Sequence, residues 1–239
     1  MSKYFTVEVK PTITASKQHI GAFSGGDVLF DWTEFEVPKG SARLVGATIL
    51  VRPQGNAAPT VNNKVMNLVI SKSNTQTLGV INSPATNRPS NDLIGNIAFA
   101  TTDFANAHMA STAVASSPTT ISAPIVLTAD QNVTSTQGYD KFYIGGLSDA
   151  QDFSTINRIN GDPDGMGTAL VIDGTSMNAL EHFLPGDVFH AHDDAVIGTA
   201  AVVANGTITL TEAIAASVLA DDDFVYNIHP IRIILQFEQ

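Results

Sequence analysis

The stretch that most constrains the fold covers residues 30–53, FDWTEFEVPKGSARLVGATILVRP. It holds two extended apolar segments separated by a Pro-Lys-Gly turn sequence at residues 38–40. The second segment, residues 44–51, is apolar on both alternating faces and rich in β-branched residues. It is too short for a buried helix, so we predict a β-hairpin whose second strand is the central strand of a sandwich.

Both ends of the chain also predict strands. In residues 4–10, Phe5, Val7 and Val9 share one face, and Pro11 ends the run. Residues 231–238 alternate in the same way. We therefore expect the first and last strands to complete the same domain.

The chain between these ends predicts more strands and no strongly amphipathic helix. Residues 100–120 are small and polar, and they are compatible with a long loop or a short helix. Long loops rich in Pro and Asn join apolar runs, for which we predict strands at residues 65–70, 93–99, 121–128 and 139–147. The whole pattern favours an all-β fold, a jelly-roll-like β-sandwich.

Residues 168–228 differ from the rest, because their apolar runs are shorter and their turns tighter. Asn205-Gly206 between two such runs is the strongest hairpin signal in the chain. We predict that residues 168–228 form a small β-barrel, inserted near the C-terminus into a sandwich made of residues 1–167 and 229–239.

Composition narrows the classes of partner and chemistry. The chain has no cysteine, which excludes thiolate catalysis and Cys-ligated metals and fits assembly in a reducing cytoplasm. Its 12 Lys and Arg against 23 Asp and Glu give a net charge of -11, so we expect no nucleic-acid partner. No apolar run approaches the roughly 20 residues of a membrane helix, so we expect no membrane partner.

The sharpest candidate for a metal site is His190, His192 and Asp194. Residues two apart on a strand face the same side, so both imidazoles could reach one ion, with the carboxylate as a third ligand. Cupins, which are metal-binding jelly rolls, use such a His-x-His strand, with a Glu soon after it and a third His. Here no Glu follows before Glu212, and His229 is the only later histidine. We expect exposed histidines at an acidic turn and no metal, with a cupin-like metal-binding enzyme as an alternative.

No other constellation predicts catalysis. The serines lack the Gly-x-Ser-x-Gly elbow, and the glycines form no phosphate-binding loop. Trp32 could stack on a sugar ring, but its segment favours core packing. We therefore expect neither enzymatic activity nor a cofactor.

The residues also carry a resemblance. Residues 31–40 followed by 44–49, together with 139–143 and the closing strand after Pro230, resemble virion structural proteins of tailed bacteriophages, especially marine cyanophages. The resemblance implies a structural role on the exterior of a virion that is assembled in the host cytoplasm.

A capsid decoration, or cement, protein fits this role best. Its partners would be the major capsid protein and copies of itself, and we expect contacts through the loops around Asn56, Asn87 and Asn106. A neck, tail or fibre component that binds host glycans is an alternative from another class.

Overall fold

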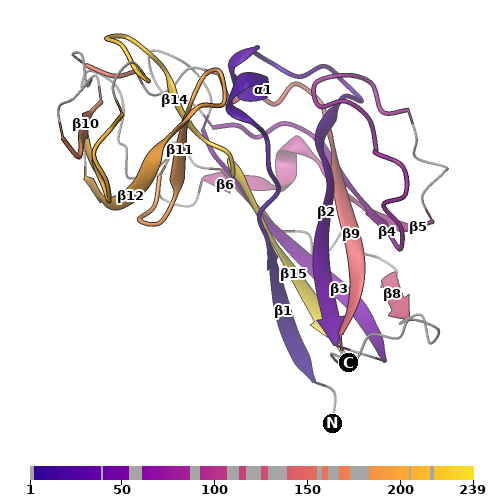
Figure 1. Ribbon diagram of the computed structural model, residues 1–239. Coiled ribbons are helices and arrows are strands. Elements are labelled where there is room, and N and C mark those ends of the chain that lie inside the picture. Colours follow the sequence, from indigo (N-terminus) through magenta and orange to yellow (C-terminus); the bar gives the residue numbers. More distant parts are fainter. Residues whose placement is uncertain are drawn as a thin grey trace.

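The protein is all-β, as predicted (Figure 1). The computed structural model describes residues 3–38, 40–53, 61–86, 92–106, 113–116, 125–128, 139–154, 158–160, 167–172, 183–204, 206–215 and 218–239. In this part of the chain, helical structure is confined to α1 (Ala15–His19) and the 3-10 turn η2 (Thr101–Asp103). Neither of these helices is long and apolar enough to cross a membrane.

Two antiparallel sheets form the larger part of the molecule. The first has the strand order β1 (Tyr4–Val9), β15 (Ile231–Glu238), β3 (Ser41–Val51), β7 (Ala113–Ser116) and β6 (Phe104–Asn106), and β8 (Ile125–Thr128) also pairs with β3. The second has the order β2 (Val28–Pro38), β9 (Tyr139–Ser148), β4 (Met66–Ser71) and β5 (Leu93–Phe99).

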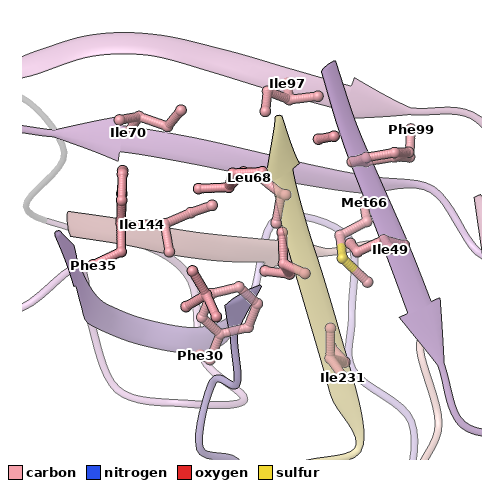
Figure 2. Packing of buried hydrophobic residues seen from close by; sticks show 14 of the residues in the cluster. Phe30, Phe35, Ile49, Met66, Leu68, Ile70, Ile97, Phe99, Ile144 and Ile231 are labelled. Atoms are coloured by element: carbon pink, nitrogen blue, oxygen red, sulfur yellow. The ribbon is translucent and has the colours of Figure 1, made fainter. Parts of the chain in front are cut away.

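The main hydrophobic core lies between these sheets. Figure 2 shows its side chains where β3 and β15 cross β4, β5 and β9. Phe30 from β2, Ile49 from β3 and Ile231 from β15 are all fully buried in it. Each such side chain contributes about 1.5–3 kcal/mol by leaving water, so burial of alternate residues holds the sheets face to face.

The predicted central strand is confirmed, but the predicted hairpin is wrong. β3 pairs with β15 along one edge and with β7 and β8 along the other. β2 pairs with β9 and not with β3. Both strands bury one face in the same core, Phe35 on β2 and Leu44 on β3, so the chain crosses between sheets at this turn. Gly40, with φ +113°, supplies a backbone conformation that other residues rarely adopt.

The strands predicted at the two ends of the chain are confirmed, and they pair with each other. β1 lies antiparallel to β15, with Phe5 opposite Phe237. The two rings stack with centroids 5.1 Å apart. The first and last strands therefore complete one sheet.

The other predicted strands have mixed outcomes. Those at residues 65–70, 93–99 and 139–147 are confirmed as β4, β5 and β9, and the described part of the one at residues 121–128 is the strand β8. Residues 101–106 form η2 and β6, and 113–116 form β7, so the expected loop or helix contains short strands instead. Residues 107–112, 117–120 and 121–124 lie outside the described residues.

The smaller part of the molecule is a five-stranded sheet with a core of its own. Its order is β10 (Ala169–Val171), β13 (Thr207–Leu210), β12 (Val196–Ala204), β11 (Val188–Ala191) and β14 (Val225–Asn227). Leu170, Phe189 and Ile208 are fully buried inside it. The hairpin predicted at residues 205–206 is confirmed, because β12 and β13 pair on either side of it.

Residues 158–160 close this sheet into a small barrel. The Ile159 nitrogen donates to the Asp223 oxygen beside β14 at 2.9 Å, and the Asn160 nitrogen donates to the Val171 oxygen of β10 at 2.9 Å. Ile159 is buried in the barrel core. The division into 1–167 with 229–239 and 168–228 stays a prediction, but Ile159 packs with the barrel although it was assigned to the sandwich.

Figure 1 shows the barrel at one end of the sandwich, with the N- and C-termini at the opposite end. The short helix α1 lies between the two parts and contacts β11 and β14. The joint around α1 therefore fixes the position of the barrel.

Candidate functional site

The residues predicted as a possible metal site lie at the joint between barrel and sandwich. β11 ends at Ala191, so His190 is on the strand and His192 is in the turn after it. The His190 Nδ1 atom lies 3.1 Å from the Asp194 main-chain oxygen. The His192 ring packs against the ring of His19 from α1, with centroids 5.2 Å apart. The two imidazoles therefore have different partners and do not share one strand.

Asp194 connects the barrel to helix α1. Its carboxylate accepts hydrogen bonds from the Ser16 main-chain nitrogen at 2.9 Å and from the Ser16 hydroxyl at 2.6 Å. Thr14, at the N-cap position of α1, makes no capping side-chain bond. Asp194 thus supplies from the barrel the acceptor that a free N–H in the first helical turn needs.

The described residues contain no group of three or more His, Asp or Glu side chains that could hold a metal ion. His190, His192 and Asp194 instead make the contacts of a structural joint.

We expect Asp194→Ala to lower the free energy of unfolding by about 1–2 kcal/mol, because an uncapped helix N–H and a hydroxyl lose their acceptor. Urea unfolding of Asp194→Ala, Ser16→Ala and the double variant measures this. The two losses should be less than additive, since both variants remove the hydrogen bond from the Ser16 hydroxyl to the Asp194 carboxylate. Simple additivity would contradict the assigned pairing.

A second group of polar contacts fixes α1 to β14. The His19 Nδ1 atom lies 2.8 Å from the Tyr226 hydroxyl. The buried Gln18 amide donates to the Ile13 oxygen at 2.7 Å and to the Asn227 oxygen at 2.8 Å. Because a buried amide that loses such partners is costly, this pair of bonds holds the segment between β1 and α1 and the barrel in one arrangement.

An ion pair forms the other side of the joint. The Arg52 guanidinium, just after β3, donates to the Asp187 carboxylate of the barrel at 2.9 Å, and both side chains are only 16% and 20% exposed. The guanidinium also lies over the Phe183 ring, 5.2 Å from its centroid. Burial lowers the pKa of Arg52 to about 10, although the charge and hydrogen bond of Asp187 raise it. Arg52 therefore stays charged at neutral pH, in a site that disfavours the charge unless Asp187 is present.

Trp32 occupies a packed position rather than an open platform. Its indole nitrogen donates to the Gln76 main-chain oxygen at 2.9 Å. Its ring lies against Gly145, where an added Cβ would come within 3.2 Å of two ring atoms. The half-buried ring also packs on the small cluster that includes Leu78. These contacts agree with the expectation of core packing.

Only part of the predicted contact loops lies within the described residues. Asn56 and Asn87 lie outside the described residues. Asn106 is the last residue of β6, the edge strand of the first sheet, and it pairs with Ala113 of β7. Asn106 is therefore in a strand rather than in a loop.

The uneven distribution of charge is a feature that our sequence predictions did not use. Residues 168–228 carry nine Asp and Glu and no Lys or Arg, whereas the rest of the chain has 14 acidic and 12 basic residues. Nearly the whole net charge of -11 therefore belongs to the barrel sequence. Counting charge by segment would have found this signal.

One outer face of the acidic barrel is uncharged. Strand register places six exposed or half-exposed residues on it, in two rows of three across β10, β13 and β12. We call this face the barrel wall, and it consists of Ala169, Val171, Val202, Ala204, Thr207 and Thr209. Val202 is 55% exposed and Val171 is 43% exposed. Exposed apolar side chains gathered on one face are typical of a contact surface.

No family model, curated protein or solved structure matches this chain.

Proposed function

We propose that the protein is a non-enzymatic structural protein of a virion, a capsid decoration protein that binds the outer surface of the shell and stabilises it. The observation that carries the proposal is the barrel wall, an exposed uncharged face on an otherwise acidic barrel. Such a face suits association with another protein, where small contacts are multiplied by the symmetry of a lattice.

The joint supports the same role. Contacts from Ser16, His19 and Arg52 hold the barrel to the sandwich, so the barrel wall has a fixed orientation relative to the sandwich. A subunit that joins neighbouring capsomers has to keep its contact surface in register with theirs. The resemblance to virion structural proteins is the reason for proposing a virion as the assembly to which the protein belongs. The acidic charge suits the outside of a shell that is filled with DNA.

A cryo-EM map of the parent particle tests the proposal. We expect density that fits a sandwich with a barrel at one end, repeated over the faces of the capsid. Density only at the neck, tail or fibres would overturn the decoration role, and absence of the chain from the particle would overturn the virion role.

Shell stability provides an independent prediction. Particles stripped of the protein should release their DNA at a lower temperature than complete particles, because the added contacts between capsomers are lost. Dye-accessible DNA during a temperature ramp measures the release, and adding back the purified chain should restore the original midpoint. Equal midpoints with and without the chain would contradict a stabilising role.

A further inference from the structure

We propose that the barrel is the end of the protein that docks on its partner, with the barrel wall at the centre of the contact and a basic protein surface opposite it. The inference rests on the proposed function for the identity of that partner, the outer surface of the capsid shell. The location of the contact and the sign of the partner's charge are inferred from the exposed residues and the charges of this chain.

The composition of the wall suits the centre of an interface. All six residues are Val, Ala or Thr, and the interface centre is where charged residues are depleted. Short side chains on paired strands also have little conformational entropy to lose on binding. Val171, Thr207 and Ala204 form one row and Ala169, Thr209 and Val202 the other, so the surface is continuous across three strands.

Acidic residues border this wall. Exposed Glu212 follows the end of β13 by two residues. On the other side, beyond β10, the Asp222 nitrogen donates to the Ile159 oxygen at 3.1 Å, which places residues 221–223 beside the closing segment. Arg158 is a basic residue in this region, and it lies 3.4 Å from the Asp222 carboxylate. A partner with Lys and Arg around an apolar centre therefore complements the wall and its border.

The same charge argues against a second copy, a nucleic acid or an anionic membrane as the partner. Two copies joined wall to wall would bring two acidic barrels together, and like charges across an interface oppose binding. DNA, RNA and anionic membranes would be repelled for the same reason.

The position of the barrel determines which end of the molecule faces the partner. Figure 1 shows both chain termini at the end of the sandwich away from the barrel. Docking through the barrel would leave the sandwich and the termini pointing away from the partner, so a fusion at either terminus should not block binding.

Co-sedimentation of the full-length chain with stripped shells of the parent particle tests the inference. We expect Val202→Glu to weaken binding at least about tenfold, because it buries a charge at the apolar centre of the contact, where the partner offers no basic group to pair with it. Val80→Glu is the matched control, because Val80 is 63% exposed on a loop of the sandwich. This control should bind like the wild type, and circular dichroism verifies that both variants fold.

The dependence of binding on salt concentration, in the wild type and in Glu212→Gln, tests the charge of the partner. Binding of the wild type should weaken as salt rises, and Glu212→Gln should reduce that dependence, because one attractive charge is removed. Binding that does not change with salt concentration would contradict the proposal that the partner surface is basic.

The possible failures are distinguishable. If the wild type binds the shells and Val202→Glu binds equally well, the docking surface is wrong while the proposed function stands. If the wild type does not bind, the proposed function fails. If sedimentation velocity instead shows a dimer that Val202→Glu dissociates, the partner is a second copy and the inference is overturned.

Discussion

Replacement of Gly146 by alanine is expected to lower the free energy of unfolding by roughly 3 kcal/mol, because the added methyl group has no room. Gly146 of β9 lies opposite Phe30 of β2 in the second sheet. An added Cβ would come within 2.6 Å of the Phe30 Cζ atom, and closer still to Cε1. Phe30 is fully buried in the main core, so its ring cannot move away without displacing other side chains.

Urea unfolding followed by circular dichroism measures this loss. Gly46→Ala is the control, because the added Cβ there meets mainly the end of the flexible Gln236 side chain, and we expect a loss below about 1 kcal/mol. Phe30→Leu introduced into Gly146→Ala should recover part of the stability by removing ring atoms. If the losses of Gly146→Ala and Phe30→Leu simply add, the close contact is not the cause.

Replacement of Arg52 by alanine is expected to destabilise the protein by roughly 2–3 kcal/mol and to uncouple the barrel from the sandwich. The variant leaves the Asp187 carboxylate, which is 20% exposed, without its cation. Asp187 also accepts a hydrogen bond from the Leu184 nitrogen at 2.9 Å, so its charge keeps one partner, which limits the loss.

The single tryptophan allows the uncoupling to be measured. Trp32 lies on β2 of the sandwich, so its fluorescence follows that part, whereas circular dichroism follows all strands. In urea the two signals should change together in the wild type and separate in Arg52→Ala. Arg43→Ala is the control, since the Arg43 side chain is 54% exposed and its 3.7 Å contact with Glu238 should contribute less than about 1 kcal/mol. Coincident transitions in Arg52→Ala would show that the ion pair does not couple the two parts.

The lowered pKa of Arg52 makes a second variant informative. Because burial outweighs the favourable effect of Asp187 on the cation, the pair itself should add little net stability. The double variant Arg52→Met with Asp187→Asn, whose amide oxygen can still accept from the Leu184 nitrogen, should therefore be close to the wild type in free energy of unfolding, and clearly more stable than Arg52→Ala. A double variant as unstable as Arg52→Ala would mean that the charges themselves hold the joint.

Local sequence patterns predicted many of the strands that the structure describes. Alternating apolar residues predicted β1 and β15, because a strand with one buried face leaves a period of two in its own residues. Apolar runs bounded by loops predicted β4, β5 and β9. The hairpin at residues 205–206 was also predictable, because Asn-Gly adopts the local turn that it needs. These features depend on residues that are neighbours in the chain.

Strand pairing and the contacts of the candidate site residues could not be predicted from local patterns, because they depend on residues far apart in the chain. The pattern of residues 30–53 is the same for a hairpin and for a crossing between sheets, and the partners β9 and β15 lie more than a hundred residues away. His190, His192 and Asp194 looked like possible ligands because their spacing is local. The partners of Asp194 and His192, which are Ser16 and His19, come from the other end of the chain. The barrel wall likewise exists only because strand register brings β10, β13 and β12 side by side, which no local pattern records.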